Sequence, residues 1–162
     1  MKNKRYILLV VILILLDQGT KALVINKLEL SETLVVNSLF NLTHVHNYGA
    51  AFSIFSDSSG LWVYFLPLVS VIASIVITVW MLRVDSKNIM KITSLSLLLS
   101  GAVGNLVDRL YLGFVEDFIS LHYQGYYFPI FNVADTLLSF GIILLIISDT
   151  KLNKNTSQAN TL

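Results

Sequence analysis

The chain contains no cysteine and few charged residues. Of its 162 residues, 55% are hydrophobic and 13% are charged. The absence of cysteine excludes disulfides, thiolate metal sites and a cysteine nucleophile. A soluble domain of this length carries about a quarter charged residues, so half that share indicates a membrane protein. The net charge of +1 gives no reason to expect a nucleic-acid partner.

Four apolar segments are long enough to cross a bilayer, which needs about 20 helical residues. The clearest is 61–82, because it contains no charged residue. We therefore predict a mainly α membrane protein with a single domain at 1–150. Its four transmembrane helices are expected at about 6–25, 61–82, 89–110 and 131–148. The polar, Asn-rich segment 151–162 is predicted to be a disordered tail.

The N-terminal segment resembles the start of a secretory signal peptide. Residues 1–5 are basic and residues 6–16 are apolar. A small-residue cleavage site does not follow, because the next residues are Asp17, Gln18, Gly19, Thr20 and Lys21. We therefore interpret the segment as an uncleaved first span.

The basic residues are divided unevenly between the two sides of the membrane. Eight of the eleven lie before the first span, between the second and third, or after the fourth: Lys2, Lys4, Arg5, Arg83, Lys87, Lys91, Lys151 and Lys154. The positive-inside rule assigns this side to the cytoplasm. Both termini are therefore predicted to be cytoplasmic.

The two long connections on the outer side differ in character. Residues 34–55 include the alternation of apolar and polar side chains that is typical of strands. We therefore expect a small extracytoplasmic β-structure at about 26–58. Residues 111–131 are rich in aromatic side chains, which favours an interfacial loop or helix.

Charged residues inside membrane spans are rare and functional by default. Acids on three predicted spans fall at a similar depth, just below the outer surface: Asp17, Asp108 and Asp135. Other polar or small residues share a helical face with these acids: Lys21 with the first, Gly101, Gly104 and Asn105 with the second, and Asn132, Thr136 and Ser139 with the third. Three polar stripes at one depth predict a wet cavity between the helices.

The same residues also have structural interpretations. These are an ion pair for Asp17 with Lys21, a helix-end ion pair for Asp108 with Arg109, and a helix cap for Asn132 with Asp135. Asp117 lies in the outer aromatic segment, where apolar flanks favour partial burial and a raised carboxyl pKa. His44 and His46 share a strand face. With no third ligand nearby and no H-E-x-x-H motif, we expect no metal site.

The candidate site is suited to acid–base chemistry by paired carboxyl groups. Two such groups at close range share one proton, so that one activates a water and the other acts as an acid. Aspartic proteases hydrolyse amides in this way. A proton- or cation-conducting transporter is the alternative, but it needs polar groups through the full depth, and the inner halves of the spans lack them. A non-catalytic scaffold is a third possibility, and these patterns alone do not select two catalytic acids.

Five motifs in this chain resemble those of lipoprotein signal peptidase (signal peptidase II), a family of bacterial membrane aspartyl proteases. They are DQGTK at 17–21, NYGAAF at 47–52, GAVGNLVDR at 101–109, VEDF at 115–118 and FNVAD at 131–135. The resemblance covers residues 17 to about 141. Ser100 is a small departure, because the family often has a second glycine before Gly101.

The resemblance implies a role for each matching residue. Asp117 and Asp135 would be the catalytic pair. The positions implied to support the site or contact substrate are Asp17, Lys21, Asn47, Gly101, Asn105, Asp108, Arg109, Asn132 and Ala134. The segment 34–55 would be the outer cradle, and the aromatic segment would contain a small mobile helix. No metal or organic cofactor is implied.

The implied reaction removes the signal peptide from a prolipoprotein. The cut would fall on the amino side of a lipobox cysteine that carries a diacylglyceryl group. The implied partners are such prolipoproteins, membrane lipid and the cyclic peptide antibiotic globomycin. We expect a monomer in the bacterial cytoplasmic membrane, with its active site near the outer leaflet.

Overall fold

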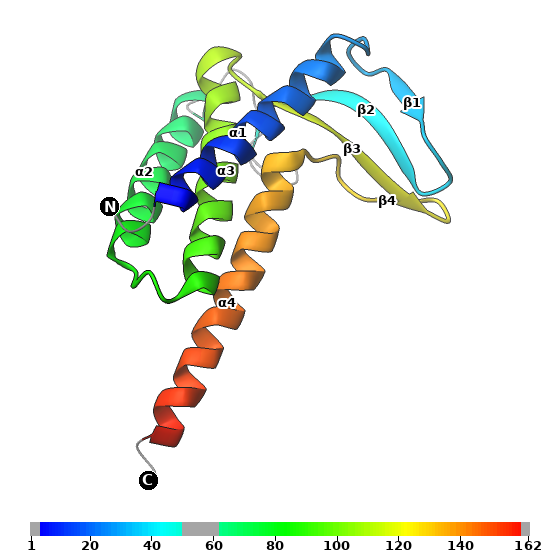
Figure 1. Cartoon of the computed structure of the whole chain (residues 1–162). Coiled ribbons are helices and arrows are strands. Elements are labelled where there is room, and N and C mark those ends of the chain that lie inside the picture. Colours follow the sequence, from blue (N-terminus) through cyan, green and yellow to red (C-terminus); the bar gives the residue numbers. More distant parts are fainter. Residues whose placement is uncertain (1–3, 50–61, 160–162) are drawn as a thin grey trace.

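The computed structural model describes residues 4–49 and 62–159 (Figure 1). Within these ranges, four long helices form one body, and a small sheet projects from one end of it. The helices are α1 (Lys4–Ile25), α2 (Trp62–Arg83), α3 (Ile89–Tyr111) and α4 (Val133–Ala159). Each is long and apolar enough to cross a membrane, which confirms the four predicted spans.

The third helix is the centre of the bundle. It packs against the other three helices, and 61% of its apolar stretch is buried, against 22%, 6% and 17% for α1, α2 and α4. The core between α1, α2 and α3 is apolar and includes Tyr6, Val10, Met81, Ile92 and Leu95. Large apolar side chains on α1, α2 and α4 remain exposed, as expected for helices that face lipid.

Two glycines allow α3 to approach its neighbours closely. A Cβ atom on Gly104 would lie 2.6 Å from Asp17 Oδ2 and 3.2 Å from Ala134 Cβ. A Cβ atom on Gly101 would meet the carbonyl oxygen of Ala134 and lie 2.7 Å from Leu138 Cγ. Small residues at these two positions therefore set the spacing of α3 from α1 and α4.

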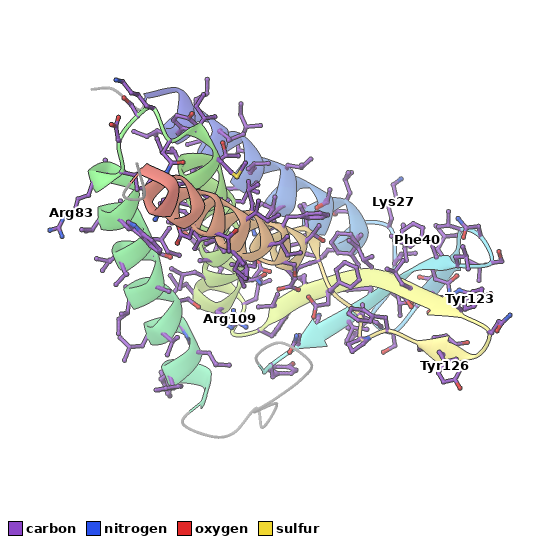
Figure 2. The ribbon with its side chains drawn as sticks, turned by 90° about the horizontal axis from the view of Figure 1, so that it is seen from below. Lys27, Phe40, Arg83, Arg109, Tyr123 and Tyr126 are labelled. Atoms are coloured by element: carbon purple, nitrogen blue, oxygen red, sulfur yellow. The ribbon has the colours of Figure 1, made fainter. Side chains whose placement is uncertain are left out.

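The sheet is an antiparallel meander with the strand order β1-β2-β3-β4. Its strands are β1 (Thr33–Val35), β2 (Phe40–Asn47), β3 (Val115–Tyr123) and β4 (Tyr126–Tyr127). The pairing of β2 with β3 joins the two long connections, and it sets Val45 opposite Asp117 and His46 opposite Glu116. Tyr123 and Tyr126 lie at the tip of the sheet, far from Arg83 at the other end of the molecule (Figure 2).

Two predictions about chain segments differ from the structure. The aromatic segment 111–131 contains β3 and β4 rather than a small helix. Its β-branched and aromatic residues pair along β2, which satisfies their backbone groups. The end of the chain was expected to be disordered from residue 151, but α4 continues as a helix to Ala159. No proline or glycine interrupts that stretch. Residues 50–58 of the expected β-structure lie outside the described ranges.

Candidate active site

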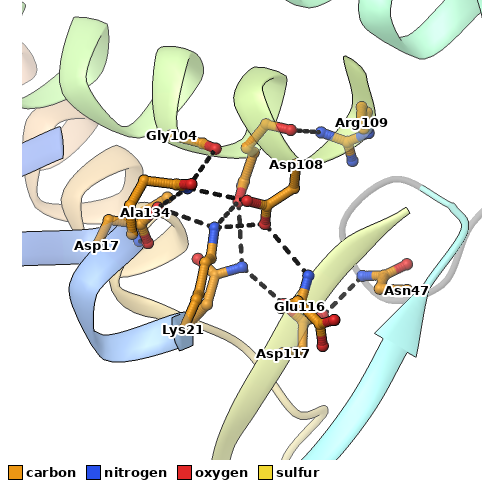
Figure 3. Close-up of polar contacts among 12 residues, drawn as sticks. Asp17, Lys21, Asn47, Gly104, Asp108, Arg109, Glu116, Asp117 and Ala134 are labelled. Atoms are coloured by element: carbon orange, nitrogen blue, oxygen red, sulfur yellow. Dashed lines mark hydrogen bonds and ion pairs between the residues drawn. The ribbon is translucent and has the colours of Figure 1, made fainter. Parts of the chain in front are cut away.

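A buried lysine on α1 joins this helix to α3 near the sheet (Figure 3). Lys21 Nζ lies 2.9 Å from Asp17 Oδ2 and 2.8 Å from Asp108 Oδ2, and it donates to Asn105 Oδ1 at 3.1 Å. An ammonium group has three donors, so all three are used. The predicted pair of Asp17 with Lys21 is confirmed. The predicted pair of Asp108 with Arg109 is wrong, because α1 brings Lys21 to Asp108 instead.

Backbone and amide donors complete this cluster. The backbone N–H of Ala134 donates to Asp17 Oδ1 at 2.8 Å, which attaches the start of α4 to α1. The backbone N–H of Glu116 donates to Asp108 Oδ2 at 3.2 Å, which attaches β3 to α3. Gln18 Nε2 lies 3.1 Å from Asp17 Oδ2 and 2.8 Å from Asp108 Oδ1. Each oxygen of the Asp17 and Asp108 carboxylates therefore has at least one hydrogen-bond or ion-pair donor.

The second pair of acids is held by amides rather than by a cation. Asp117 accepts from Asn132 Nδ2 at 2.6 Å on Oδ1 and from Asn47 Nδ2 at 2.8 Å on Oδ2. Asp135 accepts from Asn105 Nδ2 at 2.8 Å on Oδ1 and from the backbone N–H of Asn132 at 3.2 Å on Oδ2. Asn132 therefore bridges the two carboxyl groups.

The bridge is built on the first turn of α4. The backbone N–H of Asp135 donates to Asn132 Oδ1 at 2.9 Å, while the backbone N–H of Asn132 donates to Asp135. This reciprocal arrangement is a helix cap and confirms the predicted one. One cap thus satisfies the helix start and holds Asp135 beside Asp117.

The local environment raises the pKa of Asp117, the acid on β3. Burial raises the pKa of Asp117 to about 7, and the negative charge of Asp135 contributes to the increase. Hydrogen bonds from Asn47 and Asn132 and the charge of Lys21 oppose it. A carboxyl group with a pKa near neutrality can both hold and release a proton under physiological conditions.

Both acids line a cavity of about 510 Å³ that runs along α4. Besides Asp117, Asp135 and Asn47, its lining is mostly apolar and comes from the end of the β4–α4 connection and one face of α4: Phe128, Pro129, Ile130, Phe131, Thr136, Leu138, Ser139, Phe140 and Ile142. Phe140 and Ile142 are exposed on the outside of the bundle. The cavity therefore connects two acids to an apolar surface of a membrane helix.

The remaining predicted site residues lie around these two clusters. Arg109 Nη2 donates to the carbonyl oxygen of Gly49 at 2.9 Å, so it holds the backbone two residues after Asn47. Gly101 and Ala134 are fully packed at the α3–α4 contact and do not line the cavity. Their role in this structure is to set the helix spacing.

Two residues of these clusters were not predicted from the sequence. The side chain of Gln18 donates to both Asp17 and Asp108. The sequence feature that could have indicated this role is an amide residue next to Asp17 inside an apolar span. Glu116 was not singled out, yet it lies between His44 and His46 on the face of the β2–β3 pair opposite Asp117. The three residues offer ligand atoms within 4.8 Å of one another. The interpretation that the histidines have no third ligand nearby is therefore wrong.

The chain is similar in sequence to lipoprotein signal peptidases of bacteria. A family model described as signal peptidase (SPase) II matches residues 9–151. A lipoprotein signal peptidase from Acinetobacter baumannii is 42% identical over 144 residues, covering 89% of this chain and 82% of that protein. Another from Buchnera aphidicola is 40% identical over 146 residues, covering 89% and 91%.

Two solved structures share the fold. One is a bacterial membrane enzyme determined by the in meso method at 2.3 Å resolution, with a TM-score of 0.83 and 34% identity, covering 93% of this chain and 90% of that chain. A second, at 1.9 Å resolution, has a TM-score of 0.79 and 33% identity, covering 89% and 91%. The family model and these relatives span most of the chain, so this protein is a peptidase of the signal peptidase II family.

Proposed function

We propose that the protein is a membrane aspartyl endopeptidase that removes the signal peptide from diacylglyceryl-modified prolipoproteins. The cut falls on the amino side of the lipid-modified cysteine. The observation that carries this proposal is the amide-bridged pair of Asp117 and Asp135 at one end of an apolar cavity. The names of the relatives support the substrate class.

The proposed reaction uses the two carboxyl groups as a unit with one proton between them. The ionised carboxylate takes a proton from a water, whose oxygen attacks the carbonyl carbon of the scissile bond. The protonated partner gives its proton to the carbonyl oxygen, which forms a tetrahedral gem-diol. One carboxyl group then protonates the leaving nitrogen while the other takes a proton from a gem-diol hydroxyl. The C–N bond breaks, a carboxylic acid forms, and one proton remains on the pair.

The hydrogen bonds around Asp117 and Asp135 are compatible with one group acting as a base and the other as an acid. Asn132 donates to both carboxyl groups, while Asn47 and Asn105 each hold one more oxygen. Four donors fix both carboxyl groups without neutralising either of them, so a shared proton remains available. Fixed geometry of this kind keeps reacting groups in position before the substrate arrives.

The apolar wall of the cavity suits a lipid-bearing substrate. Phe140 and Ile142 are exposed on α4, where acyl chains would lie in the bilayer. Asp135 lies in the first turn of the same helix, and Asp117 on β3 lines the same cavity. The acyl chains can therefore stay in lipid while the peptide reaches Asp135. In this proposal the sheet end is extracytoplasmic and the active site is near the outer leaflet.

The distribution of charge supports that orientation. Arg83, Lys87 and Lys91 lie around the α2–α3 connection, at the end remote from the sheet. By the positive-inside rule this end is cytoplasmic, and so are both termini. The protein is proposed to act as a monomer.

A cleavage assay on the reconstituted protein tests the function. Matched prolipoprotein substrates with and without the diacylglyceryl group are incubated with wild-type protein, and the released signal peptide is measured. We expect cleavage of the lipid-modified form alone, and inhibition by globomycin. A proton or cation flux into proteoliposomes without any cleavage would instead favour a transporter. Equal cleavage of both substrates would contradict the proposed lipid specificity.

A further inference from the structure

Two histidines and a glutamate meet on the face of the β2–β3 pair that points away from Asp117. His44 and His46 come from β2, and Glu116 comes from β3. His44 and Glu116 are 6% and 4% exposed, and the side chain of His46 is 23% exposed. The cluster is therefore largely buried, and His46 is its most accessible member.

The hydrogen bonds of His44 indicate which of its ring nitrogens carries a proton. Its Nδ1 lies 3.0 Å from the carbonyl oxygen of Leu28, which only accepts hydrogen bonds, so Nδ1 carries a proton. Its Nε2 lies 2.8 Å from Glu116 Oε2. In the neutral ring this nitrogen has a lone pair directed at a carboxylate oxygen. This separation is that of a hydrogen bond, and a metal ion bound to both atoms would replace the shared proton and widen the separation to about 3.3 Å.

The position of His46 already has the spacing expected for a shared metal ion. Its Nε2 is 3.4 Å from Glu116 Oε1, which is long for a hydrogen bond. Two ligands at about 2.0–2.2 Å from a tetrahedral zinc ion lie about 3.3–3.5 Å apart. The ring of His46 is also fixed, because it stacks on Phe114 with centroids 3.8 Å apart and planes at 19°.

We infer that His44, His46 and Glu116 form a binding site for a divalent cation of the zinc class. Two imidazole nitrogens and one carboxylate oxygen match the ligands that zinc prefers, whereas magnesium and calcium prefer oxygen alone. The hydrogen bond from His44 Nδ1 to a backbone carbonyl is the orienting contact that metal-binding histidines usually make. The fourth position would be filled by water, from the exposed edge of His46.

The site connects two strands that carry the candidate catalytic machinery. Glu116 precedes Asp117 on β3, and His46 precedes Asn47 on β2. Asn47 donates to Asp117 across the same pair of strands. A cation held by His46 and Glu116 would therefore fix the register of β2 and β3 beside the acid. We expect it to stabilise the folded protein by linkage.

Metal binding is tested on the purified full-length protein after removal of metal with a chelator. Zinc is titrated by calorimetry, and the unfolding temperature is followed in parallel. We expect one zinc ion per chain, an increase in the unfolding temperature, and a visible absorption spectrum of a tetrahedral nitrogen–oxygen site when cobalt replaces zinc. Magnesium should produce neither the heat nor the temperature shift.

Two variants make the test specific. His46→Asn removes a partly exposed ligand, so the apo protein should fold with a near-normal unfolding temperature. It should lose more than the roughly 10–100-fold in zinc affinity that removal of an outer-sphere partner costs. His122→Asn is the matched control, because His122 lies on β3 outside the cluster. It should bind zinc as the wild type does.

Asp117→Asn separates this inference from the proposed function. Zinc binding should be unchanged in this variant, whether or not the protein cleaves prolipoproteins. Zinc affinity that is equal in wild type and His46→Asn would overturn the inference, and so would loss of binding in Asp117→Asn. The absence of binding in the wild type would leave a proton between His44 and Glu116 and would also overturn it.

Discussion

Two pairs of buried acids lie near the same end of the helices, and their surroundings are opposite. Asp17 and Asp108 flank the ammonium group of Lys21 at 2.9 and 2.8 Å. Asp117 and Asp135 are held by asparagine side chains and a backbone N–H. Among the described residues, no cation lies within ion-pair distance of either member of the second pair.

This difference distinguishes acids with a structural role from the candidate catalytic acids. Both carboxylates of the first pair contact the same ammonium group, and each of their oxygens has a donor, so this pair serves to join helices. The second pair lines a cavity, and a raised pKa at Asp117 keeps a proton available near neutral pH. The four acids therefore differ in whether a cation contacts them and whether they line the cavity. Their depth in the membrane, which the sequence indicates, does not separate them.

The largest expected effect comes from neutralising the second pair. Asp117→Asn or Asp135→Asn should lower the rate of prolipoprotein cleavage by about 10²–10⁴-fold or more, because the shared proton is lost. Membrane insertion and folding should persist, since an amide keeps the shape of the carboxyl group. The measurement is signal-peptide release by the purified variants. Near-normal turnover by either would refute the assignment of the pair.

Asp17→Asn is the matched control in the first pair. Asn can still accept from the N–H of Ala134, so the folded fraction should keep cleaving, with lower stability or a modestly lower rate. A well-folded but inactive Asp17→Asn protein would give Asp17 a chemical role and would remove the contrast between the two pairs.

Removing the cation should damage the first pair more than removing an acid. Lys21→Met leaves two buried carboxylates without their ion-pair partner, which should cost about 3–5 kcal/mol of unfolding free energy. The triple variant with Asp17→Asn and Asp108→Asn should recover part of that loss, because no unpaired charge remains. Thermal unfolding in detergent measures both. An unchanged unfolding temperature for Lys21→Met would show that the cluster is not structural.

The second pair should make stability depend on pH. The carboxyl group of Asp117 has an ordinary pKa of 3.8 when unfolded and about 7 when folded. Between these values the folded state binds more protons, so stability should fall by a few kcal/mol at most as the pH rises from about 4 to about 7. Asp117→Asn should flatten this part of the curve. Parallel pH curves for wild type and variant would contradict the raised pKa.

The smallest effect on stability is expected from a substitution that widens the spacing between α1 and α3 beside Asp17. Gly104→Ala places a Cβ atom 2.6 Å from Asp17 Oδ2 and should cost about 1–3 kcal/mol through overpacking. Gly19→Ala is the control, because no atom lies within 4 Å of its new Cβ. It should be neutral or stabilise α1 by up to about 1 kcal/mol. Equal unfolding temperatures for the two variants would show that the close approach is not limiting.

Features set by local periodicity could be predicted from the sequence. The four spans, the i, i+4 pair of Asp17 with Lys21 and the cap of Asn132 with Asp135 each depend on residues within one helix or its first turn. The common depth of Asp17, Asp108 and Asp135 followed from counting residues along each span. The catalytic role of Asp117 and Asp135 came only from resemblance to a family and stays a prediction.

Features that depend on distant segments were decided by the tertiary structure. Lys21 reaches Asp108 because α1 packs on α3, and this contact, not the neighbouring Arg109, compensates the acid. Glu116 joins His44 and His46 because β2 pairs with β3 in one register, across about 70 residues of chain. The sequence by itself determined which residues are polar inside the membrane. Only helix packing and strand register decided their partners, because both are set by contacts between segments far apart in the chain.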